Sequence, residues 1–195
     1  MHEYDLIADW YAADRTHVRG LPEVQAFVAA LPPRASVLDV GCGNGVPLTK
    51  FLVDAGFNIM GIDSSSRMLE KFRANLPNTP VMCSTIQAVE LPNNAFDAAI
   101  LWGMIFHLNH GDQSMAFAKV AAALKAGGRF LFTSGDRGSK EDDGIEGAPM
   151  NGVPFHYWSL GADGYREALS QVGLRLVETS QDPRHSDTYY LAEKV

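Results

Sequence analysis

The chain has 195 residues, 46% of them hydrophobic, which is enough to bury a sizeable core in one domain but leaves no room for a second large one. Its 16 lysines and arginines are outnumbered by 23 aspartates and glutamates, so the formal net charge is -7, and no block of basic residues occurs. This balance argues against a protein that holds nucleic acid through the phosphate backbone.

The first residues lack the basic start and apolar core of a signal peptide, and no apolar run approaches the roughly 20 residues that a membrane helix needs. The two cysteines, Cys42 and Cys83, fall outside any C-x-x-C pattern, which indicates reduced thiols. We therefore expect a cytoplasmic protein without a membrane partner.

In chain order, apolar periodicity and turn residues predict alternating helices and strands after an N-terminal segment. That segment covers residues 4–19, and the expected helices cover 22–31, 46–55, 65–75, 112–124 and 161–172. The expected strands cover 36–40, 57–62, 80–83, 96–102, 129–134, 174–181 and 187–194. Strands that alternate with helices indicate a parallel sheet, and the last two strands could pair as an antiparallel hairpin.

The first predicted strand runs into three glycines at alternate positions, Gly41, Gly43 and Gly45. Because glycine has no Cβ, its backbone takes positive φ and lets a ligand lie against the main chain, and a helix that begins just afterwards offers free N–H groups. Glycine-rich turns between a strand and a helix also occur for packing alone. We interpret this loop as the site of a nucleotide-like ligand.

Asp63 stands at the carboxyl end of the second predicted strand. In a doubly wound sheet the carboxyl ends of neighbouring parallel strands meet, so Asp63 is expected beside the glycine loop, where its carboxylate can accept both hydroxyls of a ribose. The spacing from Gly41 suits this role. Alternatively, Asp63 caps the helix that begins near Ser64 to Ser66, and both roles could hold.

The glycine loop departs from the G-x-G-x-x-G pattern, and Asp39 stands two residues ahead of the first glycine. A nicotinamide cofactor carries a pyrophosphate that needs helix N–H groups and a third glycine at the contact between helix and strand. S-adenosylmethionine instead carries an ammonium group, for which Asp39 and the loop carbonyls are suitable acceptors. An acid followed by G-x-G-x-G resembles the first motif of the class I S-adenosylmethionine-dependent methyltransferases.

The resemblance continues over roughly residues 35–134. The stretch 90–100, with Leu-Pro before a turn and Phe-Asp after it, is similar to the segment that leads into the family's fourth strand. Residues 101–108 resemble the segment after that strand, and 124–132 resemble the family's helix, glycine turn and fifth strand. Four motifs in the right order are far more specific than one. The family's fold is an α/β, doubly wound, seven-stranded, mostly parallel sheet with a C-terminal antiparallel hairpin and helices on both faces.

The resemblance implies S-adenosyl-L-methionine as cofactor and S-adenosyl-L-homocysteine as product. The residues that it implies for cofactor binding are Asp39, Gly41, Cys42, Gly43, Asn44, Gly45, Asp63, Ser64, Met68, Ile86, Gln87, Ala88, Trp102 and Tyr11. Many members have an acid and a small residue just before Leu-Pro, where this chain has Gln87 and Ala88. The Gln87 amide oxygen could accept from the adenine amino group and the Ala88 N–H could meet a ring nitrogen, although the alignment could also fall on Thr85 and Ile86.

The segment Tyr4 to Tyr11 lies where a substrate pocket is expected. In similar enzymes such a segment folds over the cofactor as a lid, and Tyr11 could then close on the methionine end. The alternative is a packed amphipathic helix with Leu6, Trp10 and Tyr11 as its core face.

The long glycine-rich loop over residues 135–158 is the second candidate wall, because long loops are usually functional lids or disordered. Its ligand-like cluster is His156, Tyr157 and Trp158. A sulfonium methyl group is already electrophilic, but a hydroxyl acceptor benefits from a base. His107, after the fourth strand, is the first candidate for that base, before His156 and His110; the alternative is a histidine that packs the wall or caps the next helix.

We divide the chain into a lid with the first helix (1–33), a cofactor-binding core (34–134), a substrate loop (135–158) and a C-terminal helix with a hairpin (159–195). No spaced set of metal ligands occurs. The segment Trp102 to Ile105 stands where enzymes that methylate base amines have Asn-Pro-Pro-Tyr, which favours a small apolar or aromatic acceptor and no nucleic acid. The alternatives are a non-catalytic binder of the cofactor or its product and an NAD(P)-dependent oxidoreductase.

Overall fold

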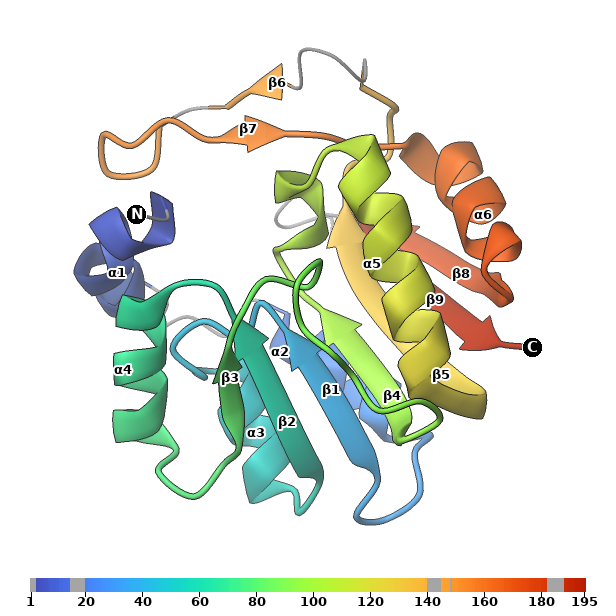
Figure 1. Cartoon of the computed structure of the whole chain (residues 1–195), viewed down its shortest axis with the longest axis horizontal. Coiled ribbons are helices and arrows are strands. Elements are labelled where there is room, and N and C mark those ends of the chain that lie inside the picture. The colour runs from blue at the N-terminus through green and yellow to red at the C-terminus, as the bar shows by residue number, and fades with distance from the viewer. Residues whose placement is uncertain (1–2, 15–19, 140–144, 148, 182–187) are drawn as a thin grey trace.

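A computed structural model describes residues 3–14, 20–139, 145–147, 149–181 and 188–195. Its main strands are β1 (Ser36–Val40), β2 (Asn58–Asp63), β3 (Val81–Cys83), β4 (Phe96–Leu101), β5 (Leu124–Ser134), β8 (Leu174–Gln181) and β9 (Thr188–Lys194). They form one seven-stranded sheet in the order β3-β2-β1-β4-β5-β9-β8 (Figure 1). Strands β1 to β5 are parallel, whereas β9 runs antiparallel to both β5 and β8. The predicted doubly wound sheet with its antiparallel hairpin is confirmed.

Helices pack on both faces of this sheet (Figure 1). They are α1 (Glu3–Asp14), α2 (Leu21–Val28), α3 (Leu48–Asp54), α4 (Ser66–Asn75), α5 (His110–Ala123) and α6 (Gly161–Gln171), with a 3-10 turn η1 (Ile105–His107) after β4. Helices α5 and α6 bury Phe117 and Tyr165 against Phe132 on one face. Helices α2 and α3 bury Phe27 and Leu52 on the other.

Strand β1 lies in the middle of the sheet and is buried from Val37 to Val40. Val37 belongs to the apolar layer beneath α2 and α3, whereas Leu38 and Val40 belong to the layer beneath α5 and α6. A parallel strand covered on both faces needs apolar side chains at successive positions, which explains why its sequence shows a continuous apolar run. The buried exception is Asp39, which points to a function.

Of the element boundaries that differ from the prediction, two have a clear cause in capping or pairing. Helix α5 begins two residues early because the Asn109 side chain accepts a hydrogen bond from the Asp112 N–H (2.8 Å) and caps the helix. Strand β5 begins at Leu124 instead of 129, because Leu124 pairs with Phe96 of β4 before a register shift. Such pairing depends on the neighbouring strand and leaves no local signal.

The segment predicted as one long loop, 135–158, contains a short antiparallel pair, β6 (Ile145–Glu146) and β7 (His156–Tyr157). The three consecutive acidic residues Glu141, Asp142 and Asp143, which the sequence predicts to be a solvated loop, lie outside the described residues. None of the helices in the described ranges is both long and apolar enough to cross a membrane.

Candidate active site

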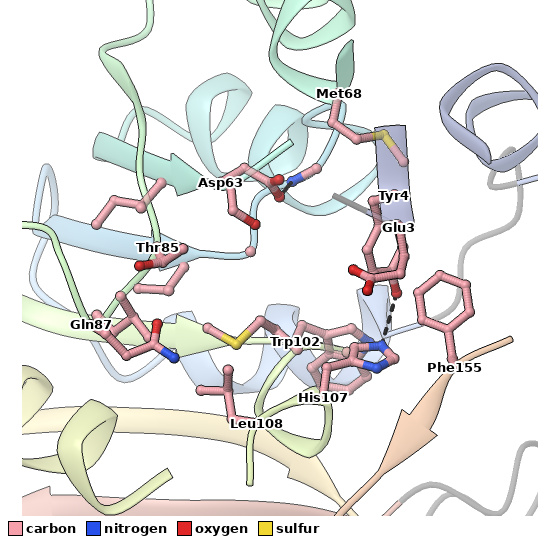
Figure 2. Close-up of a pocket in the computed structure, with 18 of the residues that line it drawn as sticks. Glu3, Tyr4, Asp63, Met68, Thr85, Gln87, Trp102, His107, Leu108 and Phe155 are labelled. Atoms are coloured by element: carbon pink, nitrogen blue, oxygen red, sulfur yellow. Dashed lines mark hydrogen bonds between the residues drawn. The ribbon is translucent and has the colours of Figure 1, made fainter. Parts of the chain in front are cut away.

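A cavity of about 350 Å³ opens at the carboxyl ends of β1, β2 and β4. Helix α1 and the segment around β7 cover it (Figures 1 and 2). A smaller cavity of about 50 Å³ lies against the glycine loop and shares Tyr11, Gly41, Gly43 and Trp102 with the larger one. The predicted glycine loop therefore forms the boundary between two neighbouring spaces.

All three glycines of the loop have positive φ, at 76°, 55° and 79° for Gly41, Gly43 and Gly45. A Cβ added to Gly45 would lie 2.8 Å from Leu76 Cδ1, and one on Gly41 would lie 2.7 Å from Met104 Cβ. A Cβ on Gly43 would meet nothing within 4 Å. Packing thus explains two of the glycines, while Gly43 faces open space where a ligand can lie on the backbone.

Asp63 braces the loop from the end of β2. Its Oδ2 accepts a hydrogen bond from the Gly43 N–H and its Oδ1 accepts one from the Ser65 N–H, both at 2.8 Å. Ser65 caps α4, because its side chain accepts from the Met68 N–H (3.1 Å). Asp63 also lines the larger cavity (Figure 2), so its carboxylate holds two backbone segments and faces the ligand space as well.

Asp39 lies below the loop, is only 5% exposed and lines the smaller cavity. Its Oδ2 accepts a hydrogen bond of 2.6 Å from the Thr49 hydroxyl. Burial raises the pKa of Asp39 to about 6, with the Thr49 hydrogen bond acting against this rise and the charge of Asp63 adding to it. The group is therefore an anion at neutral pH in a confined space, which suits a cationic ligand group.

Cys42 and Asn44 also line the smaller cavity, but their side chains support the protein itself. The Cys42 side chain packs among the apolar residues of α4, and burial raises the pKa of its thiol far above the ordinary value. The Asn44 Oδ1 accepts a hydrogen bond from the Val46 N–H (3.2 Å). We assign these two residues to the shape of the loop.

Ile86, Gln87, Ser64 and Met68, which were predicted to bind the cofactor, all line the larger cavity. The Gln87 Oε1 is buried without a hydrogen-bond partner among the described residues. Ala88 does not fit the prediction. It is exposed and absent from the cavity wall, and its N–H is bonded to Thr85 O (3.2 Å) and Thr85 Oγ1 (3.3 Å).

The alternative placement on Thr85 and Ile86 agrees better with the structure, because both residues line the cavity. The tight turn over 85–88 explains the difference, since it draws the Ala88 N–H back onto Thr85. Sequence spacing alone does not reveal such a turn.

The other end of the cavity is aromatic. His107 lies there in η1, and its ring contacts those of Tyr4, Phe106, Phe155 and Tyr157, with centroid separations of 4.7 to 5.6 Å. Trp102 lines both cavities, with its ring packed over Gly20, and His156 lines the larger one from an exposed position. His110 is absent from the wall and lies 3.4 Å from the Ser139 hydroxyl.

The packing of helix α1 differs from the alternative in which Leu6, Trp10 and Tyr11 form its core face. Leu6 is 54% exposed and Trp10 is 38% exposed, whereas Ile7 is buried. Tyr4 and Tyr11, seven residues apart and therefore on one side of a helix, both line the larger cavity. Tyr4 was predicted only as the start of the lid segment, although this spacing could have indicated it as a site residue.

Among the wall residues that were not predicted individually are Glu3, Leu108, Pro154 and Phe155. These four come from three separate segments and share no motif. Within the described part of the chain, no group of three or more histidine, cysteine, aspartate or glutamate side chains is placed to hold a metal ion.

Comparison with known proteins agrees with this geometry. The family described as "Methyltransferase domain" matches residues 37–128. An uncharacterized methyltransferase of Mycobacterium tuberculosis is 32% identical over 131 residues, which are 64% of this chain and 51% of that protein. A tRNA U34 carboxymethyltransferase of Hahella chejuensis is 28% identical over 155 residues, 73% of this chain and 46% of that protein.

Among solved structures, a 1,6-didemethyltoxoflavin-N1-methyltransferase of Burkholderia thailandensis with bound S-adenosylhomocysteine superposes with a TM-score of 0.74. It shares 17% identity, and the match covers 99% of this chain and 87% of that one. The chain spans about half the length of the curated relatives named above. Residues 37–128 therefore resemble the methyltransferase-domain family, and the fold of the chain is like that of a solved methyltransferase with bound S-adenosylhomocysteine.

Proposed function

We propose that the protein transfers the methyl group of S-adenosylmethionine to a small-molecule acceptor. One observation carries the proposal: two neighbouring cavities meet at the glycine loop, with a buried carboxylate beside the smaller and aromatic rings around the far end of the larger. Cofactor and acceptor would thus be bound next to each other. Transfer needs this proximity above all, because the sulfonium methyl group is already reactive.

In this proposal the ammonium of the cofactor's methionine part occupies the smaller cavity beside Asp39. The ribose lies over Gly43 and gives its hydroxyls to Asp63, and adenine lies against Ile86 and Met68. The Gln87 Oε1, which is buried and unpaired among the described residues, is a suitable acceptor for the adenine amino group. The methyl group then projects toward Trp102 and the aromatic end.

Acceptor size and charge support a small molecule over tRNA. Neither cavity is lined by lysine or arginine within the described residues, and the formal net charge is -7. An enzyme that binds tRNA needs cations to contact phosphates. The covered, aromatic end of the larger cavity suits a planar or apolar molecule, such as the ring compound named for the Burkholderia structure.

We place the protein in a reducing compartment, the cytoplasm, as part of the same proposal. Cys42 and Cys83 are free thiols, and Cys83 is exposed. Exposed thiols persist in reduced form in such compartments.

Calorimetry with S-adenosylmethionine and S-adenosylhomocysteine tests cofactor binding directly. We expect one site per chain for the wild type and a loss of affinity of at least tenfold for Asp63→Ala. The variant Asp54→Asn is the control, because Asp54 pairs with Lys50 on the exposed face of α3. Failure of well-folded wild-type protein to bind either compound would overturn the proposal.

The non-catalytic alternative needs a second experiment. Transfer of a labelled methyl group to a panel of aromatic alcohols, phenols, amines and thiols separates an enzyme from a binder. An enzyme labels at least one compound, whereas a binder takes up S-adenosylhomocysteine but labels none.

A further inference from the structure

Tyr4 and His107 are joined by a hydrogen bond across the cavity end. The Tyr4 Oη lies 2.9 Å from His107 Nε2 although the two residues are 103 positions apart in the sequence (Figure 2). Both side chains line the larger cavity. The hydrogen-bonded pair therefore lies at the wall of the ligand space.

Neighbouring rings hold both partners in place. The His107 ring lies 4.7 Å from Phe106, 5.4 Å from Phe155 and 5.1 Å from Tyr157, measured between centroids. The Tyr4 ring meets Phe155 at 5.1 Å in an edge-to-face arrangement. Rings packed in this way keep few rotamers, so the hydroxyl and the imidazole are pre-oriented for each other.

The helix that carries Tyr4 is fixed on the cofactor side of the cavity. Asp5 accepts a hydrogen bond from the Ser65 hydroxyl (2.6 Å) and one from the Arg67 N–H (3.3 Å). Ser65 in turn gives its N–H to Asp63. The first turn of α1, which carries Tyr4, is thus bonded to residues beside the expected ribose position.

We infer that Tyr4 and His107 act together as the base that takes a proton from a hydroxyl acceptor, an alcohol or a phenol. The inference rests on the proposed methyl transfer. As the acceptor oxygen bonds to the methyl carbon and the carbon–sulfur bond breaks, the electron pair of that bond stays on sulfur. The acceptor proton passes to Tyr4 Oη while the Tyr4 proton passes to His107 Nε2, which later releases it to water.

This relay requires the neutral imidazole with its proton on Nδ1. It also explains why an aromatic lid residue is hydrogen-bonded to the histidine. The positively charged imidazolium that forms lies among four aromatic rings, which can stabilise a nearby cation. The acceptor predicted by this arrangement is a hydroxyl compound, since an amine or thiol has less need of a base.

A double-mutant cycle tests whether the two residues are one unit. We expect Tyr4→Phe and His107→Gln each to lower kcat for the labelled hydroxyl compound by about 10²- to 10⁴-fold. The double variant should lose no more than the worse single variant, because residues that act as a unit are non-additive. Multiplied losses, or a Tyr4→Phe enzyme with wild-type kcat, would overturn the inference. Tyr189→Phe, which changes a tyrosine of β9 outside the cavity, serves as the control.

A spectroscopic experiment tests the pairing of Tyr4 and His107 without an acceptor. In protein with ¹⁵N-labelled histidine and bound S-adenosylhomocysteine, Tyr4→Phe should shift the His107 Nε2 resonance, while Tyr189→Phe leaves it in place. Unchanged His107 resonances in Tyr4→Phe contradict the pairing. Calorimetric affinity for S-adenosylhomocysteine should stay within about twofold of wild type, so a failed cofactor site and a failed relay give different results.

Discussion

Asp39 and Asp63 lie at the same edge of the sheet but in different environments. Asp39 is almost fully buried and its pKa is raised to about 6, whereas Asp63 binds the backbone N–H groups of Gly43 and Ser65. Burial disfavours the ionised form, while N–H donors favour it. One acid is thus poised to respond to a bound cation and the other to hold the loop in shape.

The raised pKa predicts how cofactor affinity changes with pH. A bound ammonium favours ionised Asp39, so affinity for S-adenosylhomocysteine should be level above pH 6 and fall up to about tenfold per unit below it. In Asp39→Asn the affinity should be weak and lack this dependence. Calorimetry at pH 5 to 8 measures this affinity. The control variant Asp54→Asn should show the same pH dependence as the wild type. A level wild-type affinity between pH 7 and 5 would contradict the role given to Asp39.

The substitution Asp39→Asn should also change the stability of the fold. Since the folded-state pKa of about 6 lies above the ordinary value of 3.8, ionised Asp39 destabilises the fold above pH 6 and the penalty fades as pH falls through that range. Without its ligand, Asp39→Asn should therefore unfold at a higher temperature than the wild type at pH 8, by the equivalent of about 3 kcal/mol. At pH 4 this advantage should shrink.

At the scale of elements, different glycines of the loop are expected to matter for packing and for ligand binding. Gly45→Ala would place a Cβ 2.8 Å from Leu76 Cδ1 at a φ of 79°, so we expect a loss of about 2–4 kcal/mol in stability. Gly43→Ala meets open space at a φ of 55° and should cost about 1 kcal/mol. It should nevertheless weaken S-adenosylhomocysteine binding, because its Cβ enters the ligand space. Thermal melts and calorimetry compare the two, and undiminished binding by Gly43→Ala would place the ligand elsewhere.

Helix α1 offers a second matched pair of variants. Asp5 accepts hydrogen bonds from Ser65 and Arg67, whereas Asp9, with a side chain 72% exposed, forms surface ion pairs with Arg67 and Lys71. Surface pairs contribute little, about 0.2–1 kcal/mol. Asp5→Ala should therefore speed amide hydrogen exchange in residues 3–14 by roughly tenfold, and Asp9→Ala by a few-fold at most. Equal effects would show that surface charge holds the helix.

Most elements of this fold could be predicted because their signals are local. Strand β8, for example, begins just after Gly173 and was predicted with its observed bounds, 174–181. The bond between Tyr4 and His107 could not be predicted, since no pattern in a single sequence links positions 103 apart. The turn onto Thr85 could not be predicted for a related reason, and it engages the Ala88 N–H that spacing assigned to adenine.

At the scale of the whole molecule, the net charge of this chain argues against a tRNA acceptor. With a net charge of -7, and with no lysine or arginine on the cavity walls within the described residues, binding to total tRNA should be absent at micromolar protein even in 50 mM salt. Filter binding measures it. Saturable binding that weakens steeply with added salt would instead favour a nucleic-acid acceptor.

Strand β9 lies between β5 and β8 although it follows both in the sequence. During synthesis on a ribosome, β5 therefore emerges with one edge open, and β8 has no strand to join until residues 188–194 have been made. An open edge of this length is a template for pairing with other nascent chains. A chaperone that binds nascent chains at the ribosome would therefore protect this polypeptide from aggregation most between the synthesis of β5 and that of β9.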